Sequence, residues 1–445
     1  MERQIEARLE ERSAQGIAVA IGSLITDGQI GSGDKLPTVR SLAAHLGVSA
    51  NTVSDAWRVL QAHGTITTDR RRGTTVRATR VGPGGRYWQV PVEPGTIDLD
   101  LSTGTPDRNL LPPVGPVLQR LHADVAVTSY VDPPLLAALE DELRRRWPYD
   151  QASLTVVDGA QDALDRVIRE LVGLGDTVIV EDPTFPPLLD MLELAGARII
   201  GVPLNDEGPD LPSLRAAMDS GPVAILTQPR AHNPTGVHTS ADRARAIAEL
   251  VLGTRTLVVE DDHSAGATGV PINSVGEHAP DNTVHIHSFS KSHGPDLRIA
   301  ALGGPVKVID NIVRRRQLGP SWTSRLIQEI LVTMLTDPTT EELVAKAAAA
   351  YRRRRDDLAG RLTDLGVSVQ PGVGLNMWVA VDDELRAVVA LAAHGIGVAP
   401  GGPFRVDPTT DQHIRISIGS LHRDLERVAK TIADAAHGRR PTVAS

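Results

Sequence analysis

Hydrophobic residues follow a helical period in the first part of the chain. In residues 16–30, GIAVAIGSLITDGQI, they recur at helical spacing and stop near a pair of glycines. Two more helical patterns follow: TVRSLAAHLG, which starts near Thr38 and ends at Gly47, and VSANTVSDAWRVLQAHG, for which Ser49 is a good N-cap. Two helices joined by a tight turn that contains glycine predict a helix-turn-helix.

The period then changes to that of extended chain. TITTDRRRGTTVRATR has β-branched runs on both sides of Arg70–Gly73, which predicts a hairpin wing. Residues 81–95, VGPGGRYWQVPVEPG, are rich in glycine and proline and lack a period, so we interpret them as a linker that spans on the order of 20 Å. The expected organisation is a head of residues 1–80, this linker, and a body of residues 96–445.

In the body, short runs rich in valine and isoleucine alternate with helical patterns. Examples are DTVIVED, PVAILTQ and TLVVEDD among the runs, and DALDRVIRELVG and DRARAIAELVLG among the helices. This alternation predicts an α/β domain with a mostly parallel sheet and helices on both faces. From about Val313 onward, long helices and then short strands predict a small C-terminal α+β subdomain. We expect Arg352–Arg355, on one of these helices, to form a solvated face.

Composition narrows the class of protein. A chain of 445 residues is expected to hold two or three domains, and the absence of cysteine excludes disulfides, thiolate metal sites and a cysteine nucleophile. The charged N-terminus has no signal-peptide core, and no apolar run of about 18 residues is present, so we expect a cytoplasmic protein without membrane spans. Residues 1–80 carry a net charge of +3 and the remainder −12. A basic head on an acidic body fits nucleic-acid binding.

The head resembles a known DNA-binding family. LPTVRSLAAHLGVSANTVSDAWRVLQAHG carries nearly the whole pattern of the winged-helix domain of GntR-family regulators. The resemblance implies that the recognition helix enters the major groove and the wing tip meets the phosphates or the minor groove. The implied DNA-binding residues are Arg40, Ser49, Asn51, Thr52, Arg72 and Gly73. Ala50 stands where the family usually has arginine, so operator preference does not carry over from relatives.

A lysine in the body, in SFSKSHGPDLR, follows a hydrophobic strand. A cofactor with an aldehyde, an aromatic ring and a phosphate needs an amine, an acid for the ring nitrogen, a flat side chain and phosphate ligands. Residues from about Thr96 to the end resemble a fold-type I, pyridoxal-phosphate-dependent aminotransferase. The resemblance implies pyridoxal 5'-phosphate as the cofactor and makes Lys291 the Schiff-base residue.

The same resemblance implies a role for each motif. The phosphate would be held by Ser288, Ser290, Arg298 and the helix-start amides of Ala160 and Gln161. The ring would be held by Phe185 in EDPTF, Asn233 in HNPTG and Asp261 in VVEDDH. Arg415 would grip a ligand carboxylate, and Tyr130 would reach the partner's phosphate across a dimer. His263 replaces the tyrosine that the family usually has two positions after the aspartate, and as a histidine it is expected to titrate near neutrality.

A GntR-type head on an aminotransferase-like body resembles the MocR-type regulators over essentially the whole chain. The resemblance implies a homodimer that binds a double-stranded DNA operator and senses a small amino compound through the Lys291 aldimine. Two alternatives stay open: an active aminotransferase with an appended head, and a sensor of pyridoxal phosphate itself. Net turnover is expected to be weak or absent. His285 and His287 share one strand face, but no third ligand is apparent, so no metal is expected.

Overall fold

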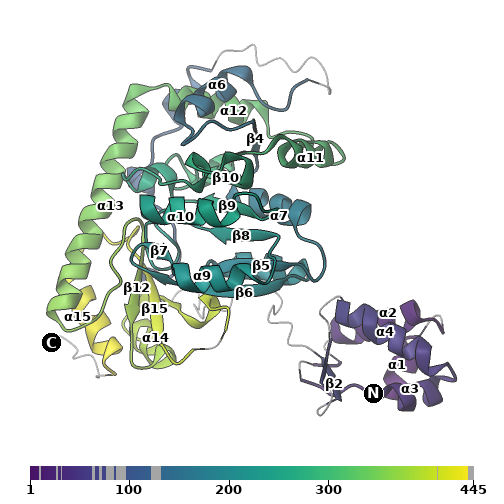
Figure 1. The fold of residues 1–445 in the computed structure, drawn as a ribbon. Helices are drawn as coiled ribbons and strands as arrows, with labels where there is room; N and C mark the ends of the chain where they lie inside the picture. The colour runs from purple at the N-terminus through teal and green to yellow at the C-terminus, as the bar shows by residue number, and fades with distance from the viewer. Residues whose placement is uncertain are drawn as a thin grey trace. The chain divides into compact units, whose positions relative to one another are not determined.

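The computed structural model (Figure 1) describes residues 1–9, 12–26, 29–31, 33–62, 66–69, 73–76, 85–86, 97–121, 132–407 and 409–438. The chain forms two compact units, one made mainly of Met1–Arg86 and the other mainly of the residues that follow. Each unit is described by itself.

The smaller unit is a winged helix. Its elements are α1 (Glu2–Ala7), α2 (Ala14–Thr26), α3 (Val39–Leu46), α4 (Ala50–Ala62), β1 (Ile66–Asp69) and β2 (Gly73–Val76). Thr38 caps α3 by accepting a hydrogen bond from Ser41 N at 3.2 Å, and Gly47 ends the helix with φ 63°. The strands β1 and β2 pair antiparallel. The predicted helix-turn-helix and hairpin wing are therefore confirmed, whereas α1 was not predicted.

The head closes around one hydrophobic cluster. Leu42 and Leu46 of α3 and Val53 and Trp57 of α4 are buried, together with Ile21 of α2. These positions are three or four residues apart on their helices, which is the spacing that places side chains on one face. Packing of the three helices therefore leaves the opposite face of α4 exposed.

The larger unit is built on an eight-stranded sheet with the order β4-β11-β10-β9-β8-β5-β6-β7. Its strands are β4 (Ser153–Val157), β5 (Thr177–Asp182), β6 (Arg198–Asn205), β7 (Gly208–Pro209), β8 (Ala224–Thr227), β9 (Leu257–Asp262), β10 (Thr283–Ser288) and β11 (Ala300–Gly304). The neighbours β5, β8, β9 and β10 are parallel, and β11 is antiparallel to both of its neighbours. The predicted mostly parallel sheet is confirmed, with an antiparallel strand near one edge.

Helices cover both faces of this sheet. They are α5 (Gly115–Leu118), α6 (Ala137–Arg146), α7 (Ala160–Leu171), α8 (Pro186–Leu194), α9 (Leu211–Met218), α10 (Ala241–Val251), α11 (Val306–Gln317) and α12 (Arg325–Leu335). Ile299 and Ala301 pack with α6 and α12 in one cluster. Because alternate residues of a strand face opposite ways, the contacts of β11 with α7 and α11 lie on the other face.

The C-terminal part forms a small subdomain. The long helix α13 (Pro338–Asp364) leads into it along one side of the larger unit (Figure 1). A three-stranded sheet follows, made of β12 (Asn376–Ala380), β14 (Ala399–Pro400) and β15 (His413–Ser417), with α14 (Glu384–Ala392) and α15 (Leu425–Ala436). An early segment joins it, because β3 (Leu99–Asp100) pairs with β13 (Ile396–Gly397). The predicted boundary near Val313 falls inside α11, which packs on α7 and β4.

The arginine run on α13 differs from the expected solvated face. Arg352 and Arg353 are exposed, but Arg355 is only 3% exposed and donates to the carbonyl oxygens of Asn376 and Gln370. The side chain of Arg355 also lies against Gly236 of the NPTG turn. The prediction was wrong for Arg355 because the helix leaves the surface where it meets the small subdomain.

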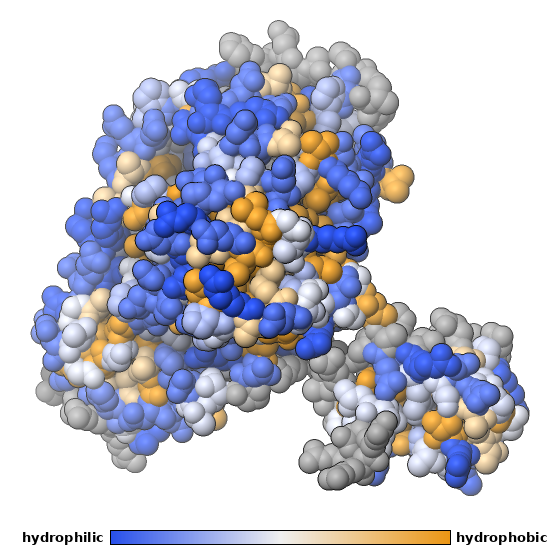
Figure 2. All heavy atoms as spheres, in the orientation of Figure 1, coloured by the Kyte–Doolittle hydropathy of each residue, from blue (hydrophilic) through white to orange (hydrophobic). Residues whose placement is uncertain are grey.

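Hydrophilic residues dominate the face of the larger unit seen in Figure 2, with apolar residues scattered between them. Across the residues that the structure describes, no helix is both long and apolar enough to cross a membrane.

Candidate functional site

The predicted cofactor residues gather where strands of the main sheet end. Asp261 lies at the end of β9, and Lys291 follows the end of β10 by three residues. Asn233 follows β8, and Phe185 follows β5. Because these four strands are parallel, their carboxyl ends share one edge of the sheet, where open α/β sheets bind ligands.

The start of α7, beside Arg298, has the features of an anion-binding site. Gly159 precedes the helix with φ 103°, and a β-carbon at this position would lie 3.0 Å from Arg298 Nη2. No side chain caps the helix start, so the amides of Ala160 and Gln161 point toward an outside acceptor. Arg298 Nη2 donates to Asp158 O at 3.1 Å, which holds the guanidinium at this place. Free helix-start amides beside a guanidinium are suited to bind a phosphate.

Two serines shape the turn before Lys291. Ser288 is buried, and its Oγ accepts a weak hydrogen bond from Ser290 N at 3.4 Å. The structure therefore brings both predicted serines to the end of β10, beside the lysine.

Asp261 presents an unpaired carboxylate oxygen inside the site. Its Oδ2 accepts from Gln228 Nε2 at 2.9 Å, while Oδ1 is shielded from solvent and has no hydrogen-bond partner among the described residues. Burial raises the pKa of Asp261 to about 7, although the Gln228 hydrogen bond lowers it. A protonated ring nitrogen next to Oδ1 would satisfy the acceptor and compensate the buried charge.

Gln228 was not among the predicted residues. Its Oε1 accepts from Asn233 N at 2.7 Å, and its own backbone N donates to Glu181 Oε2 at 2.8 Å. Together with the bond to Asp261, one side-chain amide sets the spacing between the carboxylate and the NPTG turn. The sequence offered only its position directly after β8 as a signal.

Lys291 has an amine suited to attack on an aldehyde. The side chain is half-buried, and Nζ donates to Gly104 O. Burial lowers the pKa of Lys291 to about 8, and the charge of Arg415 lowers it further, while Asp261 opposes the change. A substantial fraction of the amine is therefore neutral slightly above pH 7, as Schiff-base chemistry requires.

Arg415, on β15, reaches the site from the small subdomain. It is 1% exposed, and its guanidinium lies 5.2 Å from the centre of the Phe404 ring. Nη1 donates to Asn233 Oδ1 at 3.3 Å, and Nη2 donates to Ser102 O. The structure thus brings Arg415 and Asn233 together, as expected if both belong to one ligand site.

Gly104 connects Lys291 and Arg415, and sequence reasoning missed it. A β-carbon on Gly104 would lie 3.8 Å from Lys291 Nζ, 3.9 Å from Arg415 Nη1 and 3.6 Å from Asn376 Oδ1. Asn376 Oδ1 is buried and has no hydrogen-bond partner among the described residues. Gly104 thus lies beside an amine, a guanidinium and an amide oxygen without a described partner, which are groups that could bind the carboxylate and the amine of a small amino acid. No pattern in the sequence marked Gly104 or Asn376.

His263 requires a correction. Both ring nitrogens are shielded from solvent, and neither bonds to a described side chain. Burial lowers the pKa of His263 to about 3, and the charge of Lys291 contributes in the same direction. The expected titration near neutrality is therefore wrong, because this pocket keeps the imidazole neutral at pH 7. A neutral ring can still donate one hydrogen bond and accept another.

Other predicted residues are placed less closely or fall outside the described residues. Phe185 is half-buried and lies directly before α8. Tyr130 and Arg72 lie outside the described residues.

The predicted DNA-binding residues that the structure describes lie on α3, at the start of α4 and on β2. Arg40, Ser49 and Asn51 are exposed, and Thr52 is half-buried. Ser49 caps α4, because Thr52 N donates to its Oγ at 3.1 Å. Gly73 starts β2 with φ 87°, at the tip of the wing. Arg40 and Asn51 are therefore free to reach DNA, whereas Ser49 also has a structural task.

The histidine pair on β10 has a third neighbour. Ligand atoms of Asp262, His285 and His287 lie within 4.8 Å of one another, so the expectation of no third ligand was wrong. Asp262, however, receives two hydrogen bonds from Arg230, at 2.6 and 2.7 Å. His285 Nδ1 lies 2.9 Å from Glu260 Oε2. The Asp262 carboxylate is therefore already paired with a guanidinium, which repels a cation, and His285 binds Glu260 through Nδ1.

Comparison with known proteins matches each unit to a protein family. A family model described as "Aminotransferase class I and II" matches residues 96–432, and one described as "Bacterial regulatory proteins, gntR family" matches residues 13–76. LysN, the α-aminoadipate aminotransferase of Thermus thermophilus, superposes with a TM-score of 0.69 at 21% identity, over 79% of this chain and 96% of that one. A likeness at this identity shows the fold.

Two regulators are similar along nearly their whole length. The vitamin B6 salvage pathway transcriptional repressor PtsJ of Salmonella typhimurium is 31% identical, over 93% of this chain and 96% of that protein. The pyridoxine biosynthesis transcriptional regulator PdxR of Corynebacterium glutamicum is 26% identical, over 93% and 94%. The chain belongs to the aminotransferase class I and II family, with a GntR-type domain in front of the aminotransferase-like one. Within that family it is a transcription regulator of the MocR type.

Proposed function

We propose that this regulator binds pyridoxal phosphate at Lys291 and changes its binding to an operator when a small amino compound enters the same site. The observation that carries the proposal is the meeting of three groups: the Lys291 amine, the unpaired Asp261 oxygen and the Arg415 guanidinium. We also propose that it acts as a cytoplasmic homodimer, in which Tyr130 of one subunit serves the site of the other.

Each residue has a defined task in this proposal. Pyridoxal phosphate supplies an aldehyde that takes up an amine and a ring that withdraws electrons. Lys291 offers a partly neutral amine, Asp261 keeps a proton on the ring nitrogen, and the start of α7 with Arg298 holds the phosphate. Arg415 selects an amino compound that carries a carboxylate, because a planar guanidinium binds a carboxylate through two hydrogen bonds. The bound ligand then biases the equilibrium between dimer arrangements.

A second candidate function is supported by the names of two relatives. Both PtsJ and PdxR are named for control of vitamin B6 supply. In that case pyridoxal phosphate itself would be the signal, and no amino ligand would be needed. The two candidates differ in what must be added to the cofactor-loaded protein before operator binding changes.

One panel of amines tests both candidates and the remaining enzyme alternative. Amino acids and amines without a carboxylate are titrated into cofactor-loaded protein while the cofactor spectrum and operator binding are followed. We expect amines with a carboxylate to change both, and Arg415→Gln to remove this preference. Steady-state transamination with 2-oxoglutarate or pyruvate should stay below the usual enzymatic range of about 1–1000 per second.

The outcomes of this panel separate the candidates. Operator binding that follows cofactor loading and ignores every amine favours the sensor of pyridoxal phosphate. Turnover in the enzymatic range with any donor favours an aminotransferase with an appended head.

DNA binding should depend on the head in two distinct ways. Arg40→Gln should weaken binding to all sequences and reduce the salt dependence by about one released counterion, because a phosphate contact is lost. Asn51→Ala should instead change which sequence is preferred, at a cost of about 1–3 kcal/mol on the best site. Gel-shift titrations at several salt concentrations measure both effects.

The matched control is Arg427→Gln, which removes an exposed arginine from α15. It should leave operator binding unchanged. If a fragment without residues 1–80 binds the operator as well as the full chain, the assignment of the head is wrong.

A further inference from the structure

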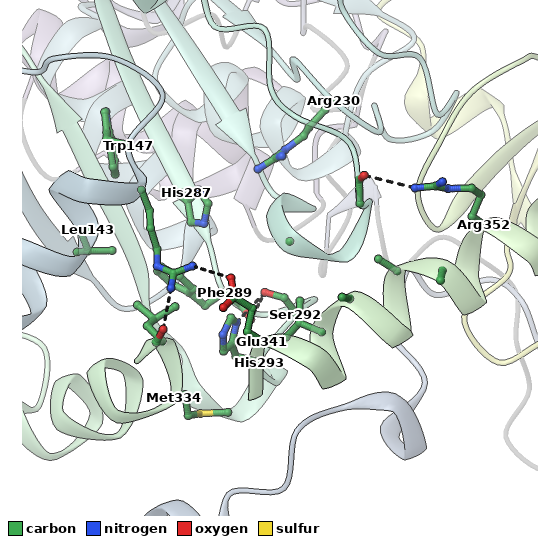
Figure 3. Close-up of a pocket in the computed structure, with 18 residues that line it drawn as sticks. Leu143, Trp147, Arg230, His287, Phe289, Ser292, His293, Met334, Glu341 and Arg352 are labelled. Carbon is green, nitrogen blue, oxygen red and sulfur yellow. Dashed lines mark hydrogen bonds and ion pairs between the residues drawn. The ribbon is translucent and has the colours of Figure 1, made fainter. Parts of the chain in front are cut away.

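A cavity lies in the larger unit, and Lys291, Asp261 and Arg415 are not among the residues that line it. It has a volume of about 600 Å³ and opens between α13, the end of α6 and strand β10 (Figure 3). The hydrogen-bond partners described for these three residues do not line it either: Gln228, Gly104, Asn233 and Ser102. Ser292 and His293 do line it, so the cavity abuts the turn that carries the lysine. Its size falls within the range of small-molecule sites, about 300–1,000 Å³.

One side of the cavity is a row of aromatic rings. The ring centres of His287 and Phe289 lie 4.9 Å apart, and those of Phe289 and His293 lie 5.6 Å apart. Burial lowers the pKa of His293 to about 4 and also lowers the pKa of His287, so both imidazoles are neutral at pH 7. Neutral aromatic rings of this kind can pack against another flat ring at these distances.

Helix α13 contributes small side chains to the lining. Ala345, Ala348 and Ala349 line the cavity, and their small side chains leave the space that larger residues would fill. Val344, one residue before, also lines it. The lining therefore combines aromatic rings with small apolar side chains, and both can pack against a planar ring.

The charge of the lining favours an anion. Three arginines and one glutamate line the cavity. Arg230 is neutralised by Asp262 at 2.6 Å, and Arg146 binds the buried Glu142 and lies 3.8 Å from Glu341. Arg352 donates to Gly269 O at 3.3 Å and has no carboxylate partner within the described part of the chain. One guanidinium thus remains available for a negative ligand.

We propose that this cavity is a second ligand site, which takes a planar aromatic carboxylate. The ring packs against His287, Phe289 and His293, and the carboxylate faces Arg352. A cationic ligand is disfavoured by the arginines, and a purely apolar one would leave Arg352 without a carboxylate partner. The site is independent of the cofactor, because it needs neither an aldehyde nor the Lys291 amine.

Calorimetric titration of the full-length protein with indole-3-acetate and with indole-3-acetamide tests the proposal. Neither probe has a primary amine, so neither can react at the aldehyde of a bound cofactor. We expect saturable binding of indole-3-acetate. Arg352→Gln should weaken it about tenfold, the usual effect of losing a hydrogen bond to a charged group, and should leave the amide unchanged.

Two further variants locate the binding. Ala345 lines the cavity at an exposed position of α13, so Ala345→Trp should fill part of the cavity with a large ring and abolish binding. Lys346→Trp, at the next position of the same helix and with a side chain that is 72% exposed, should not affect it. Absence of saturable binding, or binding that persists in Ala345→Trp, overturns the proposal. Loss of binding in Arg415→Gln also overturns it, because the probe would then occupy the Lys291 site.

Discussion

Replacing Lys291 by alanine is expected to eliminate covalent attachment of pyridoxal phosphate. No other described residue places an amine beside both the unpaired Asp261 oxygen and Arg415. Borohydride reduction followed by peptide mass spectrometry measures the attachment. The wild-type protein should carry the modification on the Lys291 peptide, and Lys307→Ala, which removes an exposed lysine on α11, should keep it in full. Modification of a different lysine in the wild-type protein would contradict the site.

The rate of cofactor uptake should also depend on pH in a defined direction. Only the neutral amine attacks an aldehyde, and the pKa of Lys291 is lowered to about 8, first by burial and then by Arg415. Uptake should therefore accelerate as pH rises and level off above about pH 8, well below the ordinary lysine value of about 10.4. Arg415→Gln removes a nearby positive charge and should move the midpoint upward. A midpoint that stays in place would mean that Arg415 does not act on the amine.

The second large effect is expected from Asp261→Asn, which should weaken cofactor binding about a hundredfold. Removing one partner of a buried charge pair usually costs about 2–5 kcal/mol, and tenfold in affinity is about 1.4 kcal/mol. Gln228→Leu should weaken binding by less, about tenfold, because it removes only the hydrogen bonds that hold Asp261 and Asn233 in place. Titration of cofactor-free protein, followed by absorbance, measures both affinities. Asp281→Asn, at an exposed position before β10, is the matched control and should have no effect.

The stability of the cofactor-free protein distinguishes a role of Asp261 in cofactor binding from a role in holding the fold together. Its pKa is raised to about 7, so between about pH 4 and 7 the folded cofactor-free protein holds a proton that the unfolded chain releases. The contribution of Asp261 to the free energy of unfolding therefore falls as pH rises through that window. Above pH 7, Asp261→Asn should be at least as stable as the wild type when both lack the cofactor. A large loss of stability there would indicate that the carboxylate supports the fold rather than the cofactor.

Local patterns were enough to predict most of the helices and strands and to mark the motifs that carry the candidate site residues. The helix-turn-helix depends on caps and periods within about 25 residues, such as Thr38 before α3 and Gly47 after it. The Val- and Ile-rich runs between helical patterns were sufficient to predict that the central strands of the main sheet are parallel. Lys291, Asp261 and Asn233 each lie in a short motif directly after a strand, and parallel strands bring their carboxyl ends to one edge.

Long-range packing decided what the sequence left open. Only the folded structure identifies Gln228 and Gly104 as candidate site residues, because their hydrogen bonds join segments up to 187 residues apart in the sequence. The same holds for Arg355, which the charge pattern assigned to solvent and the small subdomain buries. Burial also made His263 a neutral group rather than one that titrates near pH 7.

The sequence by itself determined the class of fold, the GntR-type head in front of the aminotransferase-like body and the place of Lys291 directly after a strand, because each is encoded in contiguous patterns. The tertiary structure decided the protonation of Asp261, Lys291 and His263, the meeting of Arg415 with Asn233, and the cavity beside α13. A pKa depends on how much water and which charges surround a group, and a cavity depends on which helix faces oppose each other. Both are properties of segments brought together by folding.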